Sequence, residues 1–318
     1  MKRVVKQEQR WNTDRIPDQS QRVAVVTGAG SGLGLATARA LAHRGARVVL
    51  AVRDPDKGRA AAASITAGRR DARLDVRRLD VSDLDSVRAF ADGLRAEHPR
   101  IDVLVNNAGV MAPPRTLTAQ GHELQFATNH LGHFALTGLL LDALAQAPDP
   151  RVVTVSSLEH RKARLDFDDL TGERGYAPME FYRRSKLANA VFGLELHRRL
   201  TAAGAPVRSL LAHPGYSATG LQTNGTVAVP RLLFGYLFRS LAQSADAGAL
   251  PQLYAATQPG LDGGEFIGPD GRGEMRGAPT RVEPAPGAVD AEAGRRLWEV
   301  SQELTRGAFP ELGTLTGR

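Results

Sequence analysis

The stretch RVAVVTGAGSGLG, residues 22–34, is typical of a buried strand followed by a glycine-rich turn and a helix. Its first six residues form a β-branched apolar run, and residues 33–42 are rich in Ala and Leu at helical spacing. Gly28, Gly32 and Gly34 let the backbone turn sharply and let a pyrophosphate approach the helix N-terminus, whose free N–H groups favour an anion. The order of strand, glycines and helix therefore predicts a dinucleotide-binding turn rather than a merely structural one.

Strands and helices alternate along the chain beyond this stretch. Such alternation, with nearly continuous apolar strands, predicts an α/β fold: a doubly wound parallel sheet, or Rossmann fold, with helices on both faces. Further strands are expected at 47–52, 72–79, 101–105, 151–155 and 207–212, with helices at 55–67 and 84–97. Ligands bind beyond the carboxyl ends of the strands in this fold. Polar residues do follow each strand: the glycine turn, Arg53, Asp80, Asn106 and Asn107, Ser156 and Ser157, and residues 213–215.

Length and composition limit the remaining possibilities. The 318 residues suit one large domain, and 42% hydrophobic with 24% charged residues excludes a disordered or fibrous chain. We expect a polar leader over 1–21, the dinucleotide-binding α/β domain over 22–258, and a C-terminal extension over 259–318 that ends in a helix and packs on the same domain. The Gly- and Pro-rich part of the extension, 259–287, is either a plain surface loop or a functional one. Cysteine is absent, which excludes disulfides and a thiolate nucleophile.

The charge balance bears on partners and location. A net charge of +7 suits a phosphorylated ligand. No long run of like charge occurs and aromatic residues make up only 5%, so we expect no nucleic-acid partner. No stretch approaches the ~18 apolar residues of a membrane span, and the polar start of the chain lacks a secretory signal. We expect a cytoplasmic protein without a membrane span, with a homo-oligomer left open.

The residue after the second strand bears on the choice of dinucleotide. An acid there usually contacts the ribose hydroxyls of NAD, whereas a cation accommodates the 2′-phosphate of NADP. Arg53 therefore favours NADP as the cofactor. Asp54 keeps NAD as the alternative, and Arg53 could instead pair with Asp54 or Asp56 on the surface.

Tyr182 and Lys186 stand four residues apart in FYRRSKLANAVFGLELHRRL, a segment with helical spacing, so they share a helix face. The ordinary pKa of a phenol, about 10, makes it a poor base at neutral pH, and a nearby ammonium favours the phenolate. The pair therefore predicts proton transfer. Tyr176 is a rival phenol, but no lysine follows it four residues later.

Three histidines raise the question of a metal site. His130 and His133 could share a helix face near His122, but no acidic partner completes a set of three ligands. We therefore expect no metal ion and interpret these side chains as packed or solvated histidines.

The motifs TGAGSGLG at 27–34, NNAG at 106–109, SS at 156–157, YRRSK at 182–186 and HPGYSAT at 213–219 occur in the order of the short-chain dehydrogenase/reductase family. The chain resembles this family over about residues 22–221. AVRD at 51–54, TNHLGHF at 128–134 and SKLAN at 185–189 resemble the retinol dehydrogenase and protochlorophyllide reductase-like branch. The resemblance implies an NADP-dependent oxidoreductase that interconverts an alcohol and a carbonyl. Reduction of an activated carbon–carbon double bond and a catalytically silent dinucleotide-binding scaffold are the alternatives.

The resemblance also implies a proton relay of four residues. Ser157 would hold the substrate oxygen, and Tyr182 would give or take the proton. Lys186 would tune the phenol and bind the nicotinamide ribose, while Asn129 would hold a helix carbonyl and a water in the relay. All four are present, which argues against the silent scaffold.

The implied cofactor contacts cover all of the predicted loops. Asp80 resembles the adenine contact, Asn106 the residue beside the adenosine, and Thr219 the carboxamide contact. Asp80 could instead cap a turn, and Asn106 could satisfy buried backbone groups. The full set comprises Gly28, Ser31, Gly32, Leu33, Gly34, Arg53, Asp80, Val81, Asn107, Ala108, Gly109, Tyr182, Lys186, Pro214, Gly215 and Thr219.

Two segments border the expected substrate pocket. Residues 158–181 form an insert that is longer than in the shorter family members. Residues 221–257 follow the last cofactor motif and resemble the segment that covers the substrate in this family. This cover carries apolar side chains at roughly helical intervals, which favours a lipophilic substrate, although the same stripe could be core packing or a subunit contact. Its members are Leu232, Leu233, Phe234, Tyr236, Leu237, Phe238 and Leu241.

Overall fold

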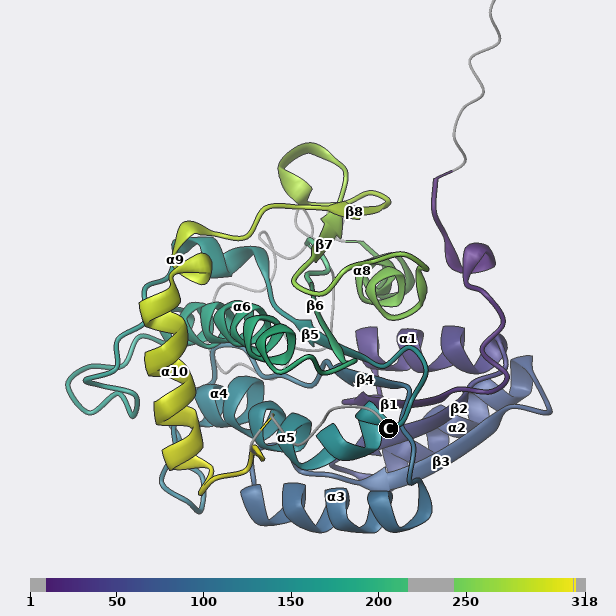
Figure 1. The fold of residues 1–318 in the computed structure, drawn as a ribbon, viewed down its shortest axis with the longest axis horizontal. Helices are drawn as coiled ribbons and strands as arrows, with labels where there is room; N and C mark the ends of the chain where they lie inside the picture. Colours follow the sequence, from purple (N-terminus) through teal and green to yellow (C-terminus); the bar gives the residue numbers. More distant parts are fainter. Residues whose placement is uncertain (1–9, 217–242, 311, 313–318) are drawn as a thin grey trace, which may run out of the picture.

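The computed structural model describes residues 10–216, 243–310 and 312, and these residues form a three-layered α/β structure around one sheet (Figure 1). The sheet has eight strands in the order β3-β2-β1-β4-β5-β6-β7-β8. The first seven strands are parallel, and β8 runs antiparallel to β7. The doubly wound parallel sheet predicted from the sequence is therefore confirmed. The strands are β1 (Val23–Thr27), β2 (Arg47–Val52), β3 (Arg73–Arg78), β4 (Val103–Asn106), β5 (Arg151–Val155), β6 (Arg208–Ala212), β7 (Phe266–Pro269) and β8 (Pro279–Arg281).

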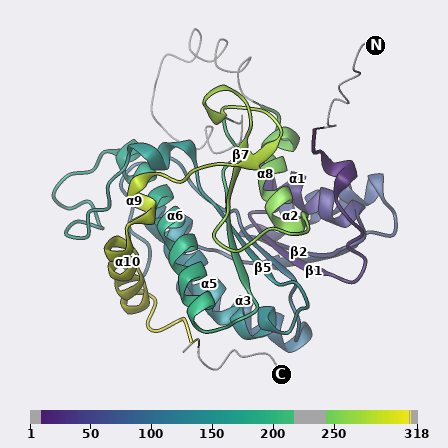
Figure 2. The same ribbon diagram turned by 45° about the horizontal axis from the view of Figure 1, so that its top comes forward.

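Helices cover both faces of the sheet (Figure 2). One apolar layer lies between the sheet and α1, α2 and α8, and a second lies under α3, α5 and α6. The last helix, α10, packs on the outer side of α6. The longer helices are α1 (Gly32–His43), α2 (Pro55–Gly68), α3 (Leu84–Glu97), α5 (Gly132–Ala145), α6 (Pro178–Ala202), α8 (Ala245–Thr257) and α10 (Ala291–Leu304). The short ones are η1 (Thr13–Arg15), α4 (Leu124–Phe126), η2 (Ala127–Leu131), η3 (Leu158–Lys162), η5 (Arg272–Glu274) and α9 (Pro286–Val289).

The Gly- and Pro-rich stretch forms two strands that the sequence pattern did not predict. In β7, Phe266 pairs with Leu211 of β6, so the sheet continues beyond the six expected strands. The strand has only four residues and ends in a proline, which leaves too short an apolar run for periodicity to reveal. The stretch is therefore part of the sheet and not a plain surface loop.

Aromatic packing attaches the C-terminal helix to the rest of the molecule. The rings of Phe134, Trp298 and Phe309 lie with their centroids 4.6–5.1 Å apart, and Phe192 contacts the same group. A Cβ on Gly138 would lie 2.6 Å from the carbonyl oxygen of residue 308, so α5 needs a glycine where residues 308 and 309 cross it. This contact places the segment after α10 directly against α5.

The segment before β1 also packs on the sheet domain. Trp11 and Ile16 are buried, although the surrounding sequence is polar. The Trp11 ring meets Tyr254 edge to face at 5.2 Å, and its indole N–H donates to Gln258 at 3.0 Å. These contacts join the segment to α8, while the domain boundaries themselves stay a prediction.

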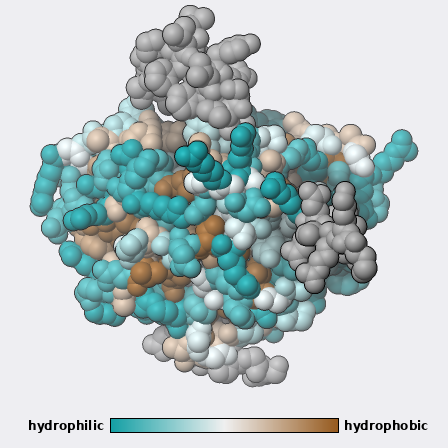
Figure 3. Space-filling model, turned by 90° about the horizontal axis from the view of Figure 1, so that it is seen from above, coloured by the Kyte–Doolittle hydropathy of each residue, from teal (hydrophilic) through white to brown (hydrophobic). Residues whose placement is uncertain are grey.

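The outer surface is mainly polar. Figure 3 shows hydrophilic residues over most of one face, with apolar residues gathered in a few patches near its middle. Within the described part of the chain, every helix is too short or too polar to cross a bilayer.

Candidate active site

The loops after the parallel strands meet at one edge of the sheet, as expected for this fold. Thr27, at the end of β1, joins its loop to the one after β4. The backbone N–H groups of Asn107 and Ala108 both donate to the Thr27 hydroxyl at 2.9 Å. The Asn107 side-chain amide donates to the Thr27 carbonyl at 2.8 Å. The predicted glycine turn and the NNAG segment are therefore held side by side.

Three glycines of the turn, Gly28, Gly32 and Gly34, lie where a side chain would be strained or would clash. Gly28 and Gly32 have φ values of 68° and 54°, in the left-handed region that favours glycine. A Cβ on Gly34 would overlap the Gly28 carbonyl oxygen and lie 2.7 Å from the Asn107 amide nitrogen. Ser31 precedes α1 without capping it through its side chain, and the first turn holds no acid. The free N–H groups of α1 therefore fit the pyrophosphate of a dinucleotide.

The cation expected near the adenosine is available for a ligand. Asp54 caps α2 by accepting the N–H groups of Asp56 and Lys57, and Asp56 pairs with Arg59. Arg53 is exposed and forms no hydrogen bond or ion pair with another residue in the described ranges. The alternative of a surface pair between Arg53 and Asp54 or Asp56 is therefore not what the structure shows.

A second cation lies close by and escaped the sequence analysis. A Cβ on Gly30 of the glycine turn would lie 3.7 Å from the Cβ of Lys57. Lys57 thus stands in the first turn of α2, beside the glycine turn. Its position four residues after Arg53 could have indicated a second cation near the cofactor. A lysine in a helix is, however, too common to be singled out from the sequence.

Ser157, Tyr182 and Lys186 come together at the end of β5. The Ser157 hydroxyl lies close enough to the Tyr182 phenol to lower the pKa of that phenol, and it accepts the N–H of Glu159 at 3.3 Å. Ser156 instead donates to the Lys186 carbonyl at 2.8 Å and so anchors α6. The structure thus separates the two serines as the resemblance implied, with Ser157 facing the phenol.

Lys186 and Asn129 complete the group. The Lys186 ammonium lies 6.0 Å from the Tyr182 ring centre and donates to the Val155 carbonyl at 3.1 Å. Asn129 stands in the π-helix η2, where its amide donates to the Val110 carbonyl at 3.0 Å. A Cβ on Gly109 would lie 3.1 Å from the Asn129 amide oxygen and 3.6 Å from the Lys186 nitrogen. All four predicted relay residues thus surround one location, and their roles stay predictions.

Burial controls the charge states here. Tyr182 is 7% exposed, and burial raises the pKa of its phenol, while the Ser157 hydrogen bond acts in the opposite direction. Burial lowers the pKa of Lys186 to about 8. The sequence led us to expect a lowered phenol pKa, and in the protein alone that expectation is wrong. A neutral Tyr182 is the form that can donate a proton.

Tyr176 lies in a different environment. Its hydroxyl lies 3.0 Å from both the Pro113 carbonyl and a Glu123 carboxylate oxygen, which compete for its single proton, and it accepts the Gln125 amide at 2.9 Å. Burial and the Glu123 charge raise the pKa of Tyr176. These bonds occupy the phenol in holding the insert, which favours Tyr182 as the reacting phenol.

The histidines near Asn129 have separate partners. His130 contacts the Ser301 hydroxyl at 2.8 Å, whereas His133 contacts the Asn129 carbonyl at 3.0 Å. Burial lowers the pKa of His130 to about 3 and that of His133 to about 4, so both rings are neutral. In the described ranges, the cluster with metal-ligand spacing is Asp75, Glu97 and His98, where Arg77 already pairs with both carboxylates.

The remaining predicted cofactor contacts differ in what their side chains bind within the protein. Asp80 accepts the N–H and hydroxyl of Ser82, so it does cap a turn. The Val81 carbonyl packs so tightly against α5 that Gly132 has no room for a Cβ. Asn106 is buried and donates to Thr137 at 2.9 Å, which points it into the core. Pro214 and Gly215 follow β6 at the same edge, while Thr219 and the apolar residues of the cover, 232–241, lie outside the described residues.

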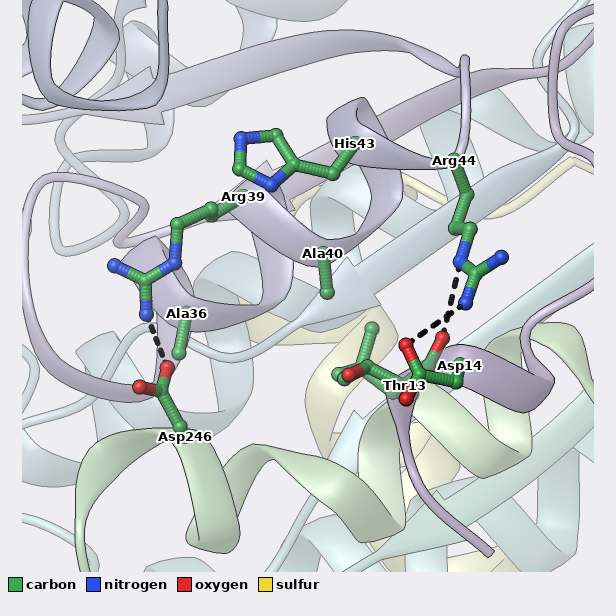
Figure 4. A pocket seen from close by; sticks show the side chains of 9 residues that line it. Thr13, Asp14, Ala36, Arg39, Ala40, His43, Arg44 and Asp246 are labelled. Carbon is green, nitrogen blue, oxygen red and sulfur yellow. Dashed lines mark hydrogen bonds and ion pairs between the residues drawn. The ribbon is translucent and has the colours of Figure 1, made fainter. Parts of the chain in front are cut away.

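A separate cavity of about 580 Å³ lies between η1, α1 and α8. Figure 4 shows Arg39 of α1 reaching toward Asp246, and Arg44, which directly follows α1, reaching toward Asp14. Arg39 pairs with Asp246, and Arg44 pairs with Asp14 at 3.4 Å. None of the predicted relay residues lines this cavity, and its charges are already paired. We therefore place the active site at the strand ends and not here.

Comparisons with known proteins bear on the family to which this chain is similar. The family model described as short chain dehydrogenase matches residues 22–227. Retinol dehydrogenase 12 of Homo sapiens is 40% identical over 285 residues, which cover 89% of this chain and 86% of that protein. A crystal structure of a protein from Mycobacterium paratuberculosis is 46% identical with a TM-score of 0.78, covering 95% of this chain and 99% of that one. A metagenomic short-chain oxidoreductase in complex with NADP is 30% identical with a TM-score of 0.57, covering 77% of this chain and 95% of that one.

The glycine turn generates a direct test. Gly34→Ala should weaken NADPH binding by about tenfold or more, because the new methyl group displaces the Gly28 carbonyl and widens the turn. Gly30→Ala is the matched control, since a Cβ there meets its nearest atom at an ordinary 3.5 Å. Titration of NADPH fluorescence measures both. Equal losses in the two variants would contradict the packing argument.

Proposed function

Because this chain belongs to the short chain dehydrogenase family, in its retinol dehydrogenase-like branch, it is an NAD(P)-dependent oxidoreductase of alcohols and carbonyls, and we propose three further features. Its cofactor is NADP, its substrate is a lipophilic alcohol or carbonyl compound, and Tyr182 is its acid and base. The observation that carries the mechanism is the position of Tyr182, with the Lys186 ammonium 6.0 Å from its ring and Ser157 near its phenol.

The proposed chemistry divides between cofactor and protein. A bound nicotinamide supplies or accepts the hydride. The Ser157 oxygen accepts the Glu159 N–H, and its own hydroxyl proton can turn from the Tyr182 oxygen to the substrate oxygen. Tyr182 is neutral in the protein and can donate its proton to a carbonyl oxygen as that oxygen becomes an alcohol. The reverse reaction returns the proton to the phenolate.

Lys186 supports this transfer in two ways. Its ammonium has three N–H groups, and one donates to the Val155 carbonyl. The others can bind the hydroxyls of the nicotinamide ribose and a water beside Asn129. The positive charge near the Tyr182 ring stabilises the phenolate that forms when the proton leaves. Proton release therefore becomes easier than the buried phenol alone allows.

The preference for NADP rests on two cations. Arg53 is exposed without a protein partner in the described ranges, and Lys57 stands beside the glycine turn. Two positive groups near the adenosine would favour a 2′-phosphate, which NAD lacks. The acid that would serve NAD, Asp54, is engaged in capping α2. NAD remains the alternative cofactor.

The proposed substrate class rests on the similar proteins and on the predicted apolar cover. Similar proteins carry the name retinol dehydrogenase, and retinol is a lipophilic alcohol. The apolar cover predicted from the sequence would suit such a molecule. Reduction of an activated carbon–carbon double bond stays an alternative reaction. A cytoplasmic location and self-association also stay predictions.

Cofactor choice can be tested by titration of NADPH and NADH fluorescence. The unaltered protein should bind NADPH more tightly, because only NADPH offers a 2′-phosphate to Arg53. Arg53→Glu should weaken NADPH selectively, by about tenfold or more, since it replaces a phosphate partner with a like charge. Arg59→Glu, in the helix α2 that follows Arg53, is a control for the general change of charge. NADH binding as tight as that of NADPH in the unaltered protein would refute the assignment.

The acid and base can be tested with two phenols. Tyr182→Phe should lower kcat by at least about a hundredfold and leave NADPH affinity nearly unchanged, because only the proton donor is lost. Tyr176→Phe is the matched control and should retain most of the activity. Steady-state absorbance of the reduced nicotinamide measures turnover. The opposite pattern, with activity lost only in Tyr176→Phe, would reassign the reacting phenol.

The substrate class can be tested with paired hydrophobic and hydrophilic alcohols, aldehydes and ketones. We expect lipophilic members to show the higher kcat/KM, because an apolar cover gains about 25 cal/mol per Å² of nonpolar surface buried. Leu233→Asp should raise KM for them without weakening NADPH binding. Val289→Asp, at an exposed apolar position in α9, is the control. A preference for polyols or sugars would rule out the lipophilic class.

A further inference from the structure

Two buried histidines connect the C-terminal extension to the loops that frame the active site. His160 lies three residues after Ser157, and His213 follows β6. Their rings pack on Phe266 of β7 at centroid distances of 5.3 and 5.4 Å. Both side chains are 0% exposed. Every polar atom of these rings therefore needs a partner within the protein.

His160 bridges Ser157 to the extension. Its Nδ1 lies 2.6 Å from the Ser157 carbonyl, and its Nε2 lies 3.1 Å from the backbone nitrogen of Ala285. A carbonyl only accepts and a backbone N–H only donates, so the proton sits on Nδ1. Burial lowers the pKa of His160, in keeping with a neutral ring. The backbone of the proposed catalytic serine is thus fixed to residue 285.

His213 makes the corresponding bridge from the other loop. Its Nδ1 accepts the Gly215 N–H at 3.2 Å, so the proton sits on Nε2 and is donated to Glu274 at 2.8 Å. Burial lowers the pKa of His213. The loop that resembles the nicotinamide contact is thus fixed to residue 274.

Glu274 joins the two bridges. Its carboxylate also accepts Arg161, next to His160, at 2.8 and 2.9 Å. Burial raises the pKa of Glu274, but the bonds from His213 and Arg161 outweigh burial and leave this pKa below its ordinary value. One carboxylate therefore holds a residue from each loop.

The backbone around Glu274 is strained where it meets the cofactor-side loop. Glu274 has a φ of 55°, in the left-handed region that non-glycine residues rarely adopt. A Cβ on Gly215 would lie 2.5 Å from the Met275 carbonyl oxygen and 2.9 Å from that of Glu274. The Tyr216 N–H donates to the Met275 carbonyl at 2.8 Å. Such strain persists only where surrounding contacts enforce it.

We propose that Glu274 is a positioning residue, which sets the spacing between the Ser157 loop and the 213–216 loop and makes the C-terminal extension part of the active site. The inference rests on the proposed function, since it takes Ser157 as the substrate contact and 213–216 as a cofactor contact. Neither His160 nor Glu274 needs to touch the substrate for this role. Each acts through the backbone that it holds.

The test compares variants of the full chain. Glu274→Ala should weaken NADPH binding and lower kcat, each by about tenfold, because both loops lose their shared anchor. Glu274→Gln keeps an acceptor for His213 and should restore NADPH affinity while leaving kcat reduced. His160→Phe keeps the ring on Phe266 and should lower kcat alone. Glu283→Ala removes an exposed carboxylate of the same extension and should change neither quantity.

A second readout needs no cofactor and no turnover. In hydrogen exchange of the protein alone, Glu274→Ala should speed exchange in peptides covering 157–161 and 213–216 and leave those of β1 to β5 unchanged. If the unaltered protein binds no NADP(H), the proposed function fails while exchange still tests the anchor. Unchanged exchange, affinity and kcat in Glu274→Ala would overturn the proposal. If Glu274→Ala does not fold, Glu274→Gln provides the test. Hydrogen exchange at 157–161 should be faster in Glu274→Gln than in the unaltered protein, and equal exchange rates would also overturn the proposal.

Discussion

The hydroxyl of Thr27 is the contact on which the site depends most. It accepts the N–H groups of Asn107 and Ala108 and lies 2.9 Å from Nε2 of His133. His133 donates from Nδ1 to the Asn129 carbonyl, so its Nε2 must accept the Thr27 proton. One side chain at the end of β1 thereby connects the glycine turn, the NNAG loop and the π-helix. A methyl group there would leave the Ala108 N–H and the Nε2 of the buried His133 without this partner.

Burial without charge compensation gives the site its chemical character. Lys186 is 4% exposed, and no carboxylate within the described part of the chain pairs with it. Burying an ammonium in this way is costly, which is why its pKa falls to about 8. The neighbouring Tyr182 phenol stays neutral for the same reason. Loss of the Tyr182 proton would create a phenolate next to the Lys186 ammonium. Each of these two charges would then stabilise the other.

The parts of this structure that could be predicted are those encoded by neighbouring residues. The glycines of the turn, such as Gly34, could be identified because a short local pattern encodes the turn. Ser157 could be identified because it directly follows a predicted strand. The sequence does not show how deeply Tyr182 is buried. We therefore expected Lys186 to lower the pKa of Tyr182, whereas burial raises it. Glu274 could not be found either, since its partners lie 113 and 61 residues away in sequence and no period links them. Contacts of that kind exist only once the sheet has formed.

The C-terminal extension both covers the edge of the sheet at β6 and holds the loops of the proposed active site, and the same residues serve both purposes. Without β7, the parallel strand β6 would stand at the edge with unpaired backbone groups, which invites association with other chains. β7 pairs with β6, and β8 ends the sheet with only three residues, the first of them Pro279. Phe266 takes part in that pairing and also packs against both His160 and His213. Covering the edge of the sheet therefore places the extension where its side chains can hold the loops of the active site.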